Sequence, residues 1–106
     1  MNEKFMELAI KESLKAYKIE EIPVGAVIVL KGKVIGKGHN KKEKEKDSTM
    51  HAEIVAIKSA CKKIKDWRLN KCSVYVTMEP CIMCMGAIIE SRIPKIFCGI
   101  KNTKWL

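Results

Sequence analysis

The stretch that decides the fold is residues 72–100, CSVYVTMEPCIMCMGAIIESRIPKIFCGI. Its first part alternates and is rich in β-branched residues, which is typical of a strand. Pro80 suits the first turn of a helix, and Pro94 is expected to end that helix. We therefore predict a strand at Cys72–Met78, a helix at Cys81–Ser91 and a last strand at about Lys95–Ile100. Two consecutive strands joined by a helix indicate a parallel crossover.

A helix and a hairpin precede this unit. Residues 2–18 carry apolar side chains at helical spacing without Pro or Gly, which predicts a first helix. The run Pro23–Leu30 is nearly all apolar and β-rich, as in a strand buried on both faces. Val34–His39 is its predicted antiparallel partner, in which Gly36 and Gly38 indicate a close backbone approach or a bulge.

A polar loop, Asn40–Thr49, leads into a second predicted helix, from about Met50 to Ile64. Polar residues that favour N-cap positions end the loop, so we expect the cap to be Asp47, Ser48 or Thr49. Helical spacing places Ile54, Ile57, Cys61 and Ile64 on one apolar face of this helix.

The order helix, strand, strand, helix, strand, helix, strand predicts an α/β fold. We expect a three-layer α/β/α sandwich whose mixed sheet has an antiparallel hairpin followed by parallel strands. Residues 1–106 are few enough to form a single domain with one core. Ligands of open α/β sheets bind outside the carboxyl ends of the strands, where the following helices begin. Residues at these helix starts are therefore the candidates for chemistry.

The composition is basic, with 21 Lys and Arg against 12 Asp and Glu and a formal net charge of +9. An excess of this size on a small domain attracts polyanions such as nucleic acid. Lysines interleaved with acids, as in Lys41–Asp47, are also typical of ordinary solvated surface. Charge alone leaves both interpretations open.

The sequence shows neither a membrane span nor a secretion signal. No uncharged apolar stretch approaches the roughly 20 residues needed to cross a bilayer, and the charged N-terminus lacks a signal-peptide pattern. We expect a cytoplasmic protein with no membrane partner. In that reducing compartment the five cysteines are expected to bind metal or to remain buried thiols.

Two short motifs at predicted helix starts supply metal ligands. His51-Ala52-Glu53 brings one imidazole, and Pro80-Cys81-Ile82-Met83-Cys84 brings two thiols on one helix face, where the helix dipole favours thiolates. We predict that His51, Cys81 and Cys84 bind one catalytic Zn²⁺ and leave the fourth position open for water. Glu53, two residues from a ligand, is the predicted proton shuttle.

Each motif alone also has a structural explanation. His51 could cap a helix, Glu53 could serve the helix dipole, and a Cys-x-x-Cys pair could be redox-active or half of a structural zinc site. A closed structural site needs a fourth ligand, for which the remaining candidates are His39, Cys61, Cys72 and Cys98. None of these belongs to a second ligand pair, which favours the open site. The three cysteines among them are more typical of small buried residues.

The combination His-x-Glu and Pro-Cys-x-x-Cys is identified as the signature of zinc-dependent nucleobase deaminases. Over essentially the whole chain, the sequence also resembles the bacterial tRNA-specific adenosine deaminases of the cytidine/deoxycytidylate deaminase superfamily. The shared motifs are Pro23-Val24-Gly25-Ala26, Gly38-His39-Asn40, His51-Ala52-Glu53-Ile54, Tyr75 to Cys84 and Ser91-Arg92-Ile93. This resemblance implies a sandwich of the cytidine deaminase type.

The resemblance also implies an activity, which is hydrolytic deamination of the wobble adenosine of a tRNA anticodon arm to inosine. The expected enzyme is a homodimer with one Zn²⁺ per subunit, and Met85–Ile93 matches the segment that packs across the dimer interface. The family's site residues correspond to metal ligands at His51, Cys81 and Cys84, a proton shuttle at Glu53 and base-binding positions at Asn40, Val24 and Ala52.

Two departures from the family's pattern occur near the C-terminus. Family members normally continue with a final strand and a basic helix, which we expect this chain to lack. Lys101-Asn102 stands where the family commonly has a basic residue followed by Asp, near the backbone of the bound nucleotide. The loss of this negative charge leaves the preference between RNA and DNA open. Two alternatives therefore stay open: a deaminase of free bases or nucleosides such as cytosine or guanine, and an inactive zinc-binding fragment.

Overall fold

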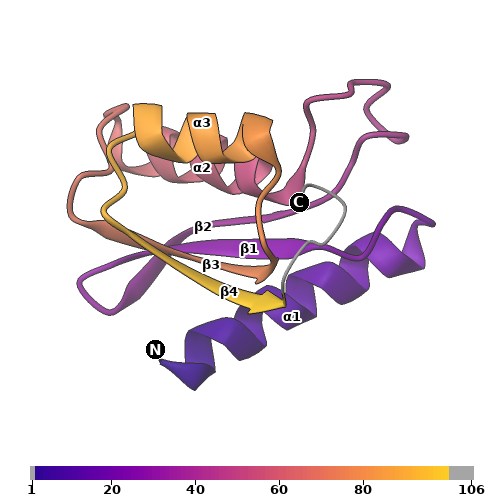
Figure 1. The fold of residues 1–106 in the computed structure, drawn as a ribbon, viewed down its shortest axis with the longest axis horizontal. Coiled ribbons are helices and arrows are strands. Elements are labelled where there is room, and N and C mark those ends of the chain that lie inside the picture. Colours follow the sequence, from indigo (N-terminus) through magenta and orange to yellow (C-terminus); the bar gives the residue numbers. More distant parts are fainter. Residues whose placement is uncertain (1, 101–106) are drawn as a thin grey trace.

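Residues 2–100 are described by a computed structural model, and over them three helices and four strands follow the predicted order (Figure 1). The prediction for Lys101-Asn102 falls outside the described residues. The elements are α1 (Glu3–Lys18), β1 (Gly25–Leu30), β2 (Lys33–His39), α2 (Ala52–Ile64), β3 (Cys72–Met78), α3 (Ile82–Glu90) and β4 (Lys95–Ile100).

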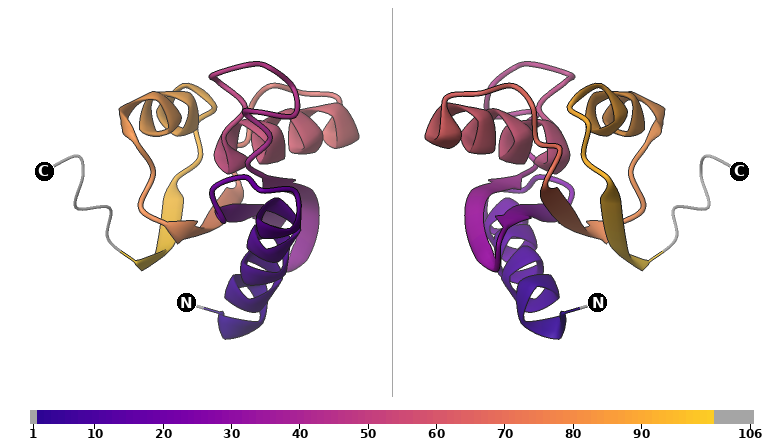
Figure 2. Two further views of the ribbon diagram at one scale, coloured as in Figure 1. Left: turned by 90° about the vertical axis from the view of Figure 1, so that its right-hand side faces the viewer. Right: turned by 90° about the vertical axis from the view of Figure 1, so that its left-hand side faces the viewer.

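The sheet has the strand order β2-β1-β3-β4. β1 is antiparallel to both β2 and β3, and β3 is parallel to β4, so the predicted mixed sheet is confirmed. Helix α1 covers one face, and α2 and α3 lie together on the other (Figures 1 and 2). Because β2 and β3 run in the same direction, α2 and α3 both begin at the same edge of the sheet.

Strand β1 is buried at every position but the last, as predicted for a central strand. Its side chains alternate between two cores. Val27 and Val29 pack with Tyr75 under α1, whereas Ala26 and Ile28 face the larger core beneath α2 and α3. No helix among residues 2–100 is long and apolar enough to cross a bilayer.

Helix α2 lies unusually close to β2. A Cβ atom on Gly38 would stand 2.3 Å from the Ala52 carbonyl oxygen, and one on Gly36 would stand 2.5 Å from that of Ala56. The strand register also shifts opposite Ile28 and Val29. The close backbone approach and the irregularity predicted at these glycines are therefore both present.

The apolar face predicted for α2 contributes to the core only in part. Ile57, Cys61 and Ile64 are half-buried and pack against the larger core. The fully buried positions are instead Ala52, Glu53, Ala56 and Ala60. The physical reason is the glycine-lined surface of β2, which brings the helix axis so near the sheet that alanine is the side chain that fits between them.

The predicted cap of α2 is wrong, because the helix begins at Ala52 with His51 as its N-cap residue. Asp47 instead accepts hydrogen bonds from the backbone N–H and the hydroxyl of Thr49, at 2.8 and 2.6 Å. Such a local turn competes with helix capping for the same carboxylate.

Candidate active site

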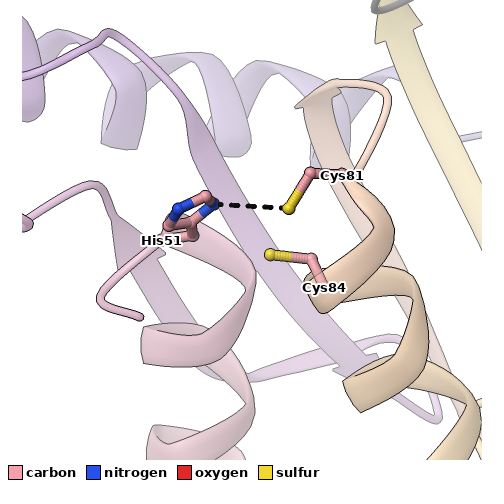
Figure 3. Close-up of side chains that lie close together, drawn as sticks. All are labelled: His51, Cys81 and Cys84. Carbon is pink, nitrogen blue, oxygen red and sulfur yellow. Dashed lines mark hydrogen bonds between the residues drawn. The ribbon is translucent and has the colours of Figure 1, made fainter. Parts of the chain in front are cut away.

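The two ligand motifs meet where α2 and α3 begin (Figure 3). His51 and Cys81 are the N-cap residues of these helices, and Cys84 lies in the first turn of α3. The ligand atoms of the three residues all lie within 4.8 Å of one another. The Sγ atom of Cys81 and the Nδ1 atom of His51 are 3.7 Å apart, as the dashed line in Figure 3 marks.

One distance between these atoms can be compared with a tetrahedral zinc site. With Zn–S and Zn–N bonds of about 2.3 and 2.0 Å, neighbouring ligand atoms lie about 3.5–3.8 Å apart. The contact between Cys81 and His51 falls in this range. One imidazole and two thiols are donors that suit zinc. Among residues 2–100, this is the one group of three or more His, Cys, Asp or Glu side chains that could hold a metal ion.

The electrostatics of the site favour a cation. Burial, followed by the negative charges of Glu53 and Cys81, raises the pKa of the Cys84 thiol far above its usual range. A divalent ion reverses this effect, because coordination removes the thiol proton. Burial and the nearby charge of Lys42 lower the pKa of His51, which keeps the imidazole neutral as a ligand must be.

Neither His51 nor Cys81 uses its side chain to cap its helix. At α2 the first amide is satisfied from a distance, because the buried Oδ1 atom of Asn40 accepts a 2.7 Å hydrogen bond from the Ala52 N–H. The Asn40 side chain, directly after β2, thus satisfies a helix N–H in place of an N-cap side chain. The His51 imidazole is left free to face the two sulfurs.

The three residues expected to bind a base lie together. The backbone N–H of Asn40 donates to the Val24 carbonyl at 3.3 Å, and the Asn40 side chain binds Ala52. All three residues are buried. Their contact with a base stays a prediction. While the bond to Ala52 persists, the NH₂ group of Asn40 is the part of this side chain left for a ligand.

Glu53 lies in the first turn of α2 and is 3% exposed. It takes part in none of the ion pairs found among the described residues. Burial raises the pKa of its carboxyl, opposed in part by its own backbone amide and by the Cys84 thiol. A carboxyl that is held this close to the metal ligands and is ready to bind a proton is suited to proton transfer.

No fourth His or Cys among residues 2–100 joins this group. The Nδ1 atom of His39 instead lies 3.3 Å from a carboxylate oxygen of Glu12. Cys61, Cys72 and Cys98 are free thiols in or against the larger core.

One buried carboxylate that binds the loop before α2 was not anticipated from the sequence. Glu21 is 7% exposed and accepts hydrogen bonds from the backbone N–H groups of Glu43 and Lys44. Nothing in the sequence distinguishes Glu21 from the exposed Glu20 beside it. Its only signal is a place two residues before the Pro23-Val24 motif.

A family of known proteins matches nearly the whole chain. Residues 1–100 match the family described as the cytidine and deoxycytidylate deaminase zinc-binding region. The chain belongs to this family. The zinc-binding character of this deaminase family agrees with the three ligand positions at the starts of α2 and α3.

Within the deaminase family, the chain is similar to tRNA-specific adenosine deaminases. It is 48% identical to the Aquifex aeolicus protein over 102 residues, covering 96% of this chain and 68% of the relative. It is 45% identical to the Bacillus subtilis protein over 103 residues, covering 97% of this chain and 64% of the relative. The chain thus spans about two thirds of the length of these curated relatives.

Two solved structures confirm the deaminase fold. One comes from a study of A-to-I editing by tRNA:A34 deaminases; it superposes with a TM-score of 0.94 at 42% identity, covering 96% of this chain and 78% of the other. The other is a guanine deaminase from Bacillus subtilis, with a TM-score of 0.92 at 37% identity, covering 97% and 67%. The predicted sandwich of the cytidine deaminase type is confirmed.

Proposed function

We propose that this chain deaminates adenosine to inosine hydrolytically at the wobble position of a tRNA anticodon. The observation that carries the chemistry is the convergence of His51, Cys81 and Cys84 beside the buried Glu53. The substrate class rests on the identity of 45–48% with tRNA-specific adenosine deaminases. The net charge of +9 also suits a polyanionic partner. We expect the reaction to take place in the cytoplasm.

In this proposal His51, Cys81 and Cys84 hold the metal. Bound zinc would lower the pKa of its water, so that hydroxide is available as the nucleophile at neutral pH. The Glu53 carboxylate accepts a proton from the attacking water. The water oxygen bonds to the ring carbon that bears the amino group. Glu53 then delivers the proton to that amino group, so that the C–N bond breaks and ammonia leaves. The burial of Glu53 keeps bulk water from exchanging with this proton.

In this proposal Asn40 and Val24 hold the base. Asn40 can donate from its NH₂ group while its oxygen anchors Ala52. Val24, which is bonded through its carbonyl to Asn40, forms the wall beside it. One side chain therefore contacts the substrate and fixes the helix that carries the proton shuttle.

The test is inosine formation in a synthetic anticodon stem-loop with a wobble adenosine, with zinc measured on the same preparation. Glu53→Gln is the matched variant, because it keeps the size of the side chain and removes only the proton carrier. We expect it to keep zinc and its fold while the rate falls at least about 10²–10⁴-fold. Loss of zinc from this variant would contradict the assigned role. Zinc-loaded wild-type protein that makes no inosine would overturn the proposed reaction.

A deaminase of free bases is the second candidate, favoured by the superposition on a guanine deaminase. Guanine and cytidine as parallel substrates separate the two. A free base carries no phosphate, so its kcat/KM should respond little to salt. Turnover of RNA through electrostatic contacts should fall steeply as salt is added.

We also propose that the protein is a homodimer that associates through α3. Ile82 and Ile89 are 83% and 59% exposed, and their spacing of seven residues puts them on one face of this helix. Exposed apolar side chains grouped in this way mark an interface. In sedimentation experiments Ile89→Lys should shift the protein toward monomer, whereas Leu14→Lys on the exposed side of α1 should not.

A further inference from the structure

The segment that enters β1 and the loop that leaves β2 are joined by three hydrogen bonds. The Asn40 N–H donates to the Val24 carbonyl at 3.3 Å. The N–H groups of Glu43 and Lys44 donate to the two carboxylate oxygens of Glu21, at 3.2 and 2.8 Å. A carboxylate that binds two successive amides makes charge-assisted bonds, which fix the main chain more firmly than neutral ones.

The loop is closed by its own main chain as well. The Lys41 N–H donates to the Met50 carbonyl at 2.9 Å, directly before His51. Across the loop, the amides of Glu45 and Asp47 donate to the carbonyls of Lys41 and Lys42, at 2.8 and 3.1 Å. Yet the side chains of residues 42–49 are all exposed. The loop is therefore an ordered backbone that presents its side chains to solvent.

This loop lies at the edge of the candidate active site. Its ends are Asn40, which binds Ala52, and Met50, which precedes His51. Lys42 directly follows Lys41, whose N–H binds the Met50 carbonyl next to His51. The exposed lysines of the loop therefore lie on a segment whose two ends adjoin the candidate site.

The loop's net charge is small, because Glu43, Glu45 and Asp47 alternate with its lysines. General attraction of RNA therefore does not explain why a buried carboxylate holds it. Placement does, since a lysine contributes most when it is fixed where a phosphate must lie. When a base enters the site, the phosphates on either side of that base come next to the rim of the site.

We propose that Glu21 is a positioning residue, which holds residues 41–46 of this loop in place. Lys42 and its neighbouring lysines then bind the phosphates that flank the target base. This inference rests on the proposed function and names the part of the chain that would hold the RNA backbone. Glu21 itself does not touch the RNA in this arrangement.

The decisive comparison is Glu21→Gln against Glu20→Gln, each in a zinc-loaded Glu53→Gln background, so that bound RNA is not turned over. Both changes remove one negative charge from the same turn, so general electrostatics predicts slightly tighter binding of the stem-loop for both. A glutamine at position 21 keeps one acceptor but turns an NH₂ group toward the second amide. We therefore expect Glu21→Gln to weaken binding about tenfold and Glu20→Gln not to weaken it.

A second pair of variants tests the lysine directly. Lys42→Gln should reduce the slope of log affinity against log salt by about 0.7, the value for one contact with single-stranded RNA. Lys63→Gln removes the same charge at the far end of α2 and should leave the slope unchanged. Equal slopes for the two variants would overturn the proposed contact even if Glu21→Gln failed to fold.

A third measurement needs no RNA. Trypsin should cut after Lys42 and Lys44 faster in Glu21→Gln than in wild type or Glu20→Gln, because release of the two amides opens the loop. Unchanged cleavage, or stem-loop binding by Glu21→Gln as tight as by Glu20→Gln, overturns the inference and leaves the proposed function intact. A parent protein that does not bind the stem-loop at all overturns both.

Discussion

Substitution of Gly38 by alanine should detach the metal ligand of α2 without touching any ligand. The new Cβ atom would stand 2.3 Å from the Ala52 carbonyl oxygen and 2.5 Å from the Ala56 nitrogen. Ordinary contact begins at 3.4 Å, so the two backbones must separate by about 1 Å. Both atoms belong to the backbone of the first two turns of α2, where no flexible side chain can give way.

The expected cost follows from that geometry. Overpacking a close-packed interior typically costs about 1–3 kcal/mol, and a clash with backbone belongs at the upper end. A shift of α2 also carries His51 and Glu53 away from Cys81 and Cys84. Zinc ligands tolerate errors of only about 0.2 Å, so the affinity for zinc should fall at least about tenfold.

The assay is denaturant unfolding of the zinc-loaded protein, together with zinc release to a competing chelator. Gly86→Ala is the matched control, because it adds the same methyl group in mid-α3 with no heavy atom within 4 Å. Both variants are compared in an Ile89→Lys background, because Gly86 lies on the face of α3 proposed for the dimer. There the change should stabilise by up to about 1 kcal/mol through helix propensity. If Gly38→Ala proved as stable as wild type and held zinc as tightly, the close approach of β2 would not be what positions His51.

Three further changes test the site and its supports. Cys84→Ser should lose bound zinc and stability together, and a stable protein that still contains zinc by metal analysis would refute its assignment as a ligand. Asn40→Ala should speed hydrogen exchange at the Ala52 amide and weaken zinc retention, whereas Asn40→Asp, which keeps the acceptor, should do neither. Equal exchange in both variants would mean that Asn40 does not anchor α2. Burial opposes ionisation of Glu12, but hydrogen bonds and charges from its two basic neighbours outweigh it and lower the pKa below 4.5. Its stabilisation is therefore complete above pH about 4.5 and lost as the pH falls through the lower folded value. The stability difference between wild type and Glu12→Gln should shrink over that range in acid unfolding curves.

Much of the fold was predictable because its signals are local. The apolar run in β1, the alternation in β3 and the prolines that flank α3 each depend on a few adjacent residues. The convergence of the three candidate ligands was predictable for a related reason. The ligand types are scarce, and both motifs stand where helices begin at one edge of a sheet.

The errors lie where tertiary contact outweighs local preference. The spacing of Ile54, Ile57 and Cys61 is a sound helical pattern, but the pattern does not say how near the sheet will come. The glycines of β2 decide that distance, and they favour the alanine face instead. The cap was mispredicted for the same reason, since Asn40 reaches the Ala52 amide from twelve residues away.

The hydrogen bonds between Glu21 and the loop show why contacts of this kind are hard to predict from the sequence. The partners of Glu21 are the main-chain N–H groups of residues 43 and 44, so no complementary side chain is required there. Any residue except proline has a backbone N–H, so positions 43 and 44 can carry almost any side chain and still donate to Glu21. Lys44→Pro removes the N–H of the shorter bond to Glu21 and should therefore free the loop, as Glu21→Gln does. Lys44→Ala keeps that N–H and should leave the loop held. Equal trypsin cleavage after Lys42 in these two variants would show that the amide of Lys44 does not hold the loop.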